Sequence, residues 1–220
     1  MLKAVVFDLD GTLLDRDASL RRFLENQYYR LIHHLSHIPK GQYISRFIEL
    51  DCKGYVWKDN VYQQLVQEFK VQGISWQDLL EDYIEEFQHS CIPFPNLISM
   101  LENLENNSIK LAMITNGKGQ FQMDNIRGLG MEHYFDCILV SEQEGMKKPD
   151  PAIFHKALEL LGVLPHEAMY IGDHPENDVK GAKSVGMVGV WKKNEAWECE
   201  DADFTIKDLG EIPLIVSGLQ

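Results

Sequence analysis

The sequence is short of cysteine and has no long apolar run, and each shortage excludes a class of protein. Its four cysteines lie far apart and form no CxxC pair, which indicates scattered, reduced thiols. No apolar run approaches the length of a membrane span. The N-terminal run is short, turns polar at Asp8 and lacks a signal-peptide cleavage pattern. We therefore expect a cytoplasmic protein with no membrane partner.

Basic residues are also scarce. Lysine and arginine number 21 against 34 acidic residues, which gives a formal net charge of −13. This charge disfavours a surface for phosphate backbones, so we expect no nucleic acid as a standing partner. An anionic substrate must instead be met by local cations, from a metal or from a few placed lysines. No pattern indicates an oligomeric state. The 220 residues, 45% of them hydrophobic, are enough for one α/β domain with a modest insertion.

The first apolar run ends in two carboxylates. Ala4–Phe7 is typical of a buried parallel strand, and Asp8 and Asp10 follow it. Open α/β sheets bind ligands at this end of their strands, and two adjacent carboxylates repel each other unless a cation such as magnesium compensates. On this stretch alone, a strand end that caps the next helix is an equal alternative. An EF-hand loop is disfavoured because the glycine required at its sixth position is absent.

A helical segment interrupts the chain after this strand. Apolar residues recur at helical spacing through residues 17–91, which predicts an all-helical insertion of about four helices. The last of these helices begins with the capping-box spacing Ser75 to Asp78. The break at residues 51–58 combines a glycine, two cations and two aromatic residues. It is the candidate for a loop that selects substrate, with an exposed helix–helix turn as an equal alternative.

Short apolar strands alternate with helices in the rest of the chain. We expect strands at 109–114, 135–140, 168–171 and 187–191, and helices at 97–104, 120–129, 151–161 and 179–185. This alternation predicts crossover units and a mainly parallel sheet with helices on both faces. Residues 1–16 and 92–220 are therefore predicted to form an α/β core into which residues 17–91 are inserted.

Polar groups follow the second, third and fourth predicted strands. They are a hydroxyl with an amide and a glycine, two lysines, and two acids: Thr115, Asn116, Gly117, Lys147, Lys148, Asp173 and Asp178. Each has a structural alternative, such as a turn and helix cap, a solvated lysine or a helix start. Residues 118–119 do not form a P-loop, because the required spacing and the terminal serine or threonine are missing.

Four segments together resemble the motifs of a known superfamily. DLDGT at 8–12, ITNG at 114–117, KKPDP at 147–151 and GDHPEND at 172–178 are similar, in order and with plausible spacing, to those of the haloacid dehalogenase-like hydrolases. The resemblance spans the predicted core, and the helical insertion stands where that family carries its C1 cap. It implies a Rossmann-like parallel sheet, a cap that closes over the core and excludes water, and Mg²⁺ as cofactor.

The resemblance also implies roles for the acidic residues. Asp8 would be the nucleophile that attacks phosphorus and forms an aspartyl-phosphate. Asp10 would protonate the leaving oxygen and then deprotonate the hydrolytic water. Magnesium would be held by the Asp8 side chain, the Asp10 backbone carbonyl and Asp173, with Asp178 ordering one of its waters.

The remaining motif residues would bind and neutralise the phosphoryl group. Lys148 would neutralise charge on the nucleophile and on the phosphoryl group, and the proline after it favours it over Lys147. The hydroxyl of Thr115 would donate to a phosphoryl oxygen, assisted by the backbone N–H groups of Asn116 and Gly117.

The favoured function is a magnesium-dependent phosphomonoester hydrolase that acts on a small phosphorylated metabolite. A phosphosugar mutase with the same nucleophile and a catalytically silent binding module are the alternatives. Dehalogenation is disfavoured because dehalogenases of this superfamily lack the second aspartate, which is Asp10 in this chain.

Overall fold

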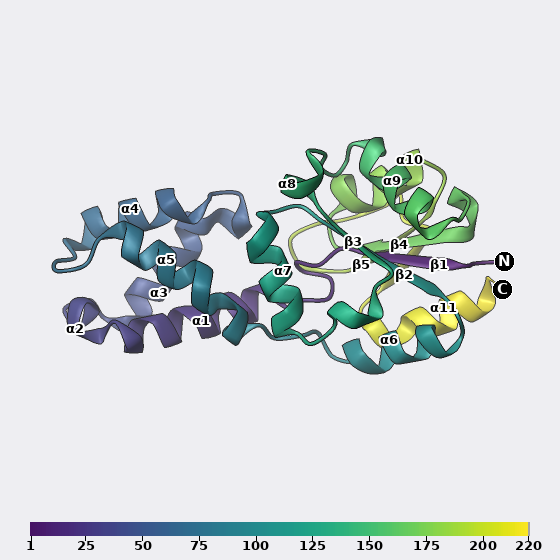
Figure 1. The fold of residues 1–220 in the computed structure, drawn as a ribbon. Coiled ribbons are helices and arrows are strands. Elements are labelled where there is room, and N and C mark those ends of the chain that lie inside the picture. The colour runs from purple at the N-terminus through teal and green to yellow at the C-terminus, as the bar shows by residue number, and fades with distance from the viewer. Residues whose placement is uncertain (220) are drawn as a thin grey trace. The chain divides into compact units, whose positions relative to one another are not determined.

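The computed structural model describes residues 1–219, which fall into two compact units (Figure 1). One unit combines Met1–Arg16 with the chain from Ile92 onward, and the other is Asp17–Cys91. The first is an α/β unit and the second is all helical. Among the described residues, no helix has both the length and the apolar character needed to cross a bilayer.

Six parallel strands form the sheet of the α/β unit, in the order β3-β2-β1-β4-β5-β6. Its strands are β1 Ala4–Phe7, β2 Lys110–Thr115, β3 Cys137–Val140, β4 Ala168–Gly172, β5 Val188–Lys192 and β6 Phe204–Ile206. Every residue of β1 and β4 is buried, which explains why these central strands are continuous apolar runs in the sequence. The predicted Rossmann-like α/β fold is confirmed.

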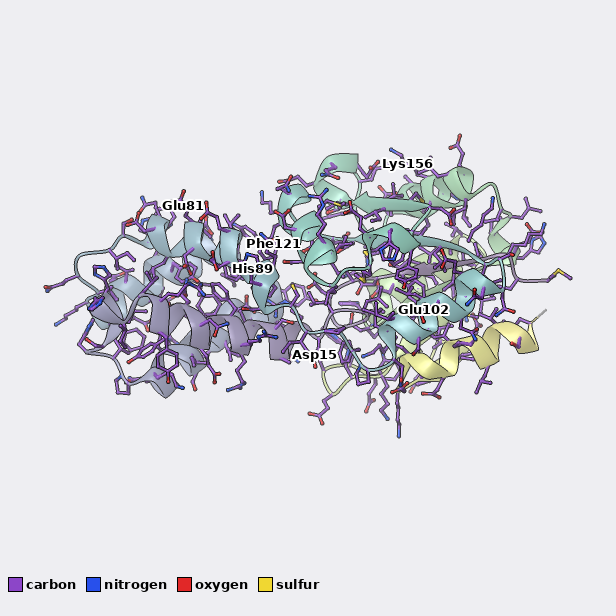
Figure 2. All side chains as sticks on the ribbon, turned by 60° about the horizontal axis from the view of Figure 1, so that its bottom comes forward. Asp15, Glu81, His89, Glu102, Phe121 and Lys156 are labelled. Carbon is purple, nitrogen blue, oxygen red and sulfur yellow. The ribbon has the colours of Figure 1, made fainter. Side chains whose placement is uncertain are left out.

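Helices cover both faces of this sheet. They are α6 Leu97–Asn106, α7 Gly119–Gly128, α8 Ser141–Glu144, α9 Pro151–Leu161, α10 Gly181–Ser184 and α11 Ile212–Gly218. Figure 1 shows α9 and α10 on one face and α6 and α11 on the other. Lys156 of α9, which is labelled in Figure 2, forms an ion pair with Glu144 of α8. The side chain of Asp150 caps the start of α9, and Gly162 ends it in the left-handed conformation.

Several elements differ from the sequence prediction. The helix predicted at 179–185 begins earlier, as a π-helical turn at Pro175–Lys180 that leads into α10. Nδ1 of His174 accepts the backbone N–H groups of Glu176 and Asn177, so this ring caps the turn before the predicted start. Strand β6 and the short helices α8 and α11 were not predicted, because segments of this length carry too little periodicity.

The helical unit contains α1 Arg16–Arg30, α2 Ile32–Leu35, α3 Lys40–Asp51, α4 Lys58–Phe69 and α5 Trp76–Glu86. Aromatic rings form much of its core, and the ring centroids of Phe47 and Tyr62 lie 5.2 Å apart. The buried amide of Gln27 accepts from the hydroxyls of Tyr43 and Tyr62, which satisfies these polar groups inside the core. Helix α5 begins with the predicted capping box.

The candidate substrate-selecting loop at 51–58 is anchored by a buried ion pair. Nζ of Lys58 lies 2.5 Å from Oδ1 of Asp51, and both side chains are almost fully buried. Between them, Cys52 and Lys53 adopt positive φ, and Tyr55 is exposed. The loop is thus fixed at both ends, while its role in substrate selection stays a prediction.

Candidate active site

The polar motifs that follow β1, β2 and β4 start at the same edge of the sheet, because the ends of these strands are in register. Phe7, the last residue of β1, pairs with Met113 on β2 and with Ile171 on β4. Since all of these strands are parallel, the segments that follow β1, β2 and β4 leave the sheet together at its carboxyl edge. The register therefore brings residues that are far apart in sequence into one site.

A buried lysine joins two of the predicted acids. Nζ of Lys148 donates to Oδ1 of Asp8 at 2.7 Å, to Oδ1 of Asp178 at 2.6 Å and to the hydroxyl of Tyr170 at 2.9 Å. Lys148, Asp8 and Asp178 are all buried. The hydroxyl of Thr12 donates to the second carboxylate oxygen of Asp8 at 3.0 Å. One ammonium group thus compensates two buried carboxylates.

Burial and charge act against each other in this cluster. Burial raises the pKa of Asp8 to about 7, with Lys148 lowering it and Asp178 raising it. Burial also acts to lower the pKa of Lys148, but the charges of Asp178 and Asp8 outweigh this effect and hold that pKa well above its ordinary value. Lys148 therefore keeps its positive charge although it is buried.

Asp173 completes an oxygen-rich group beside Asp8. Burial, together with the charges of Asp8 and Asp178, raises the pKa of Asp173 to about 8. Its carboxylate lies against the backbone of Gly11, because a Cβ at Gly11 would stand 2.3 Å from Oδ2 of Asp173. Gly11 has φ +84°, so both its conformation and this close approach require glycine.

Three of these acids fit a divalent cation. Carboxylate oxygens of Asp8, Asp173 and Asp178 lie within 4.8 Å of one another. Hard oxygen ligands of this kind suit magnesium, and a divalent cation would offset the negative charge of Asp173, which the ammonium group shared by Asp8 and Asp178 does not contact. Asp178 already accepts from Lys148 and from the backbone N–H of His174, so its oxygens are more constrained than those of Asp173.

Asp10 faces a different neighbour. Its Oδ2 accepts from Nε2 of Gln122 at 2.8 Å, and the same nitrogen lies 2.6 Å from Oγ1 of Thr115. Gln122 stands on the first turn of α7, close to Gly117, where a Cβ would lie 2.8 Å from Cγ of Gln122. The structure thus joins the second acid and the predicted phosphoryl-binding hydroxyl through one amide.

Asn116 holds the backbone of Lys148. Its Nδ2 donates to the carbonyl of Lys148 at 3.0 Å, and its Oδ1 accepts the N–H of Lys148 at 2.9 Å. The backbone N–H of Gly117 donates to Oγ of Ser141 at 3.0 Å. The Asn116 side chain therefore positions the lysine, a role that the sequence did not suggest. Lys147, the rival of Lys148, is exposed.

Several residues that contact this site were not predicted from the sequence. Gln122 lies in the first turn of α7, beyond the motif at 114–117, and belongs to no recognisable pattern. Tyr170 donates its hydroxyl to the carbonyl of Ile114 at 3.2 Å, and a tyrosine in an otherwise apolar strand next to a motif was the available signal. Lys192 donates to the carbonyl of Gly11 at 3.2 Å, and Asn194 donates to Asp173. Lys192 ends β5 and Asn194 follows it, and no motif was assigned to this strand.

Known proteins resemble the chain along most of its length. Residues 5–191 match the family model described as haloacid dehalogenase-like hydrolase. The chain is 40% identical over 217 residues to a glyceraldehyde 3-phosphate phosphatase of Methanopyrus kandleri, with 86% of this chain and 83% of that protein covered. It is 31% identical over 135 residues to a phosphoserine phosphatase of Thermus thermophilus, with 61% of this chain and 54% of that protein covered.

A solved structure agrees with these sequence matches. The crystal structure of a HAD phosphatase from Thermococcus onnurineus is 31% identical to this chain, with a TM-score of 0.69 and 99% of both chains covered. The predicted family is therefore confirmed: this chain belongs to the haloacid dehalogenase-like hydrolases.

Proposed function

We propose that this hydrolase is a magnesium-dependent phosphatase that acts on a small phosphorylated metabolite through an aspartyl-phosphate on Asp8. The observation that carries the proposal is the buried Asp8–Lys148–Asp178 cluster with Asp173 beside it. The names of the relatives, phosphatases of glyceraldehyde 3-phosphate and of phosphoserine, support the same reaction class.

The first step transfers the phosphoryl group to Asp8. A carboxylate oxygen of Asp8 forms a bond to phosphorus while the bond from phosphorus to the ester oxygen of the substrate breaks. Asp10 gives its proton to that departing oxygen, so the alcohol leaves neutral. Gln122 fixes the orientation of Asp10 by donating to its Oδ2. Lys148 offsets the negative charge that gathers around Asp8.

The second step releases inorganic phosphate. The oxygen of a water molecule bonds to phosphorus, the bond between phosphorus and Asp8 breaks, and Asp10 takes a proton from that water. Asp8 returns to its carboxylate form, hydrogen-bonded to Lys148 and Thr12. Asp10 thus acts as acid and then as base, and it regains its starting protonation state at the end of the cycle.

Magnesium would be held by the Asp8 side chain, the Asp10 backbone carbonyl and Asp173, with Asp178 ordering a water. When bound, the ion supplies positive charge that favours approach of the anionic phosphoryl group to an anionic nucleophile. Thr115 and the backbone N–H of Asn116 would bind phosphoryl oxygens, and the N–H of Gly117, which donates to Oγ of Ser141 in this structure, would join them only if it exchanged that acceptor for a phosphoryl oxygen. We further propose that the helical unit, residues 17–91, is the cap of this enzyme.

The presence of Asp10 favours hydrolysis of phosphate esters over dehalogenation, since a carbon–halogen bond needs no proton donor at its leaving group. A mutase would use the same two aspartates. The two activities are separated by their products, because only the hydrolase accumulates inorganic phosphate.

Phosphate release from a panel of phosphorylated compounds tests the proposal. The panel contains glyceraldehyde 3-phosphate, phosphoserine, sugar phosphates and nucleotides, each assayed with magnesium and with chelator. We expect release from at least one compound, lost with chelator and restored by added magnesium. Release that persists in chelator would contradict the metal dependence. Conversion of a sugar phosphate into its positional isomer, with no free phosphate formed, would establish a mutase.

Replacing Asp10 by asparagine is expected to lower kcat by at least about two orders of magnitude, because the variant can neither donate nor accept the proton. The change keeps the shape of the side chain and an oxygen that can accept from Gln122. Steady-state kinetics on the best panel substrate measure the effect, with Asp124→Asn on α7 as the matched control. A near-normal rate would mean that another group moves the proton.

A further inference from the structure

The end of β5 and the segment after it contact the backbone and side chain of Asp173. The indole Nε1 of Trp191 donates to the carbonyl of Asp173 at 2.8 Å. The Nδ2 of Asn194 donates to the same carbonyl at 3.1 Å and to the carboxylate Oδ2 of Asp173 at 3.0 Å. One amide therefore binds Asp173 at both its main chain and its side chain.

Gly11 lies against the same carboxylate oxygen of Asp173 that Asn194 contacts. The approach of Oδ2 to the α-carbon of Gly11 leaves no space for a side chain there. Nζ of Lys192 donates to the carbonyl of Gly11 at 3.2 Å, and Lys192 is itself buried. The end of β5 and the residues after it thus contact both Asp173 and the backbone of the glycine against which its carboxylate lies.

The Asn194 amide is itself fixed by its own loop. Its Oδ1 accepts the backbone N–H groups of Ala196 at 2.8 Å and Trp197 at 3.1 Å. Since these two donors require the oxygen on their side, the NH₂ group must face Asp173. The ring of Trp197 lies 4.8 Å from the ring of His174, the neighbour of Asp173, which ties the loop to the same segment.

We propose that Asn194 is a positioning residue that orients Asp173 for magnesium binding. The inference rests on the proposed function, because it concerns the metal of that reaction. A carboxylate with one oxygen fixed by a donor cannot rotate freely, so the Asp173 carboxylate stays in the orientation that places one of its oxygens within 4.8 Å of carboxylate oxygens of Asp8 and Asp178. Outer hydrogen bonds of this kind set the geometry of metal ligands, and their loss weakens metal affinity by about 10- to 100-fold.

Magnesium titration of the full chain by isothermal calorimetry tests the proposal without substrate. Asn194→Ala removes both the donor to Asp173 and the acceptor for the loop. Asn194→Ser keeps an acceptor for the loop N–H groups, because a serine hydroxyl can form the equivalent turn, but it is too short to replace the donor to Asp173. Asn107→Ala, at the opposite end of the unit where α6 leads into β2, is the matched control.

We expect the magnesium Kd to rise by about 10- to 100-fold in both Asn194 variants and to stay unchanged in the control. At saturating magnesium, kcat of both variants should return close to the wild-type value. A raised magnesium Kd with an unchanged kcat would not result from a general loss of structure. Wild-type affinity in both variants, or in Asn194→Ser alone, would overturn the positioning role. If the wild-type chain itself bound no magnesium, the proposed function would fall, and this inference with it.

Discussion

Replacing Asp8 by asparagine is expected to abolish phosphate release, with a loss of at least about 10⁴-fold in kcat. The asparagine oxygen can still accept from Lys148, and its NH₂ can donate to the hydroxyl of Thr12, so the shape and the hydrogen bonds of the site are retained. An amide is a far weaker nucleophile than a carboxylate, and no bond to phosphorus forms. Discontinuous phosphate assays over long incubations measure the residual rate.

The control for this variant is Asp201→Asn, which makes the same chemical change at an exposed aspartate outside the cluster. It should retain full activity. The melting temperature of Asp8→Asn should be at least that of the wild type, because the variant removes one buried acid from a site with excess negative charge. Activity of Asp8→Asn within about tenfold of the wild type would exclude Asp8 as the nucleophile.

Replacing Lys148 by methionine is expected to lower the free energy of unfolding by about 3–5 kcal/mol, besides removing activity. Methionine keeps most of the volume but leaves Asp8 and Asp178 buried without their shared ammonium group. Denaturant unfolding in chelator measures the change. Lys147→Met is the matched control, and its stability should stay within about 0.5 kcal/mol of the wild type because Lys147 is exposed.

A second change separates lost charge compensation from lost packing. Asp178→Asn added to Lys148→Met removes one of the two uncompensated acids, so it should restore part of the lost stability. If the double variant were no more stable than Lys148→Met, the charge argument would be wrong. Activity should not return, since the ammonium beside Asp8 is still missing.

The loss of stability in Lys148→Met should also depend on pH. Lys148 lowers the pKa of Asp8, which burial raises to about 7, so its removal raises that pKa further. A carboxyl whose pKa is higher in the folded protein adds stability at low pH, and this contribution is lost as the pH rises through the folded pKa. The variant should therefore lose less stability at about pH 6 than at about pH 8.

Much of the fold follows from patterns that depend on local sequence. The strand Ala4–Phe7 and the helix Pro151–Leu161 have the predicted bounds, because each combines a clear apolar pattern with a defined end. The motif acids Asp8 and Asp178 and the lysine between them come together because parallel strands deliver their carboxyl ends to one edge.

The contacts that support these groups were not predictable in the same way. Gln122 reaches Asp10 from across the sheet edge, and Asn194 reaches Asp173 from a neighbouring strand end. Neither residue has a periodicity or a spacing that marks it, because its role depends on strand order rather than on its own segment. The start of the helix after Asp173 depended likewise on the ring of His174, whose capping contact is visible only in the structure.

The most direct test of the account is to identify the residue that carries the phosphoryl group during turnover. The enzyme is mixed with magnesium and its best substrate, quenched in acid, and digested for mass spectrometry, with Asp8→Asn treated in parallel. We expect one phosphoryl group on Asp8 in the wild type and none in the variant. A wild-type enzyme that turns over substrate but carries the phosphoryl group on another residue would contradict the central claim.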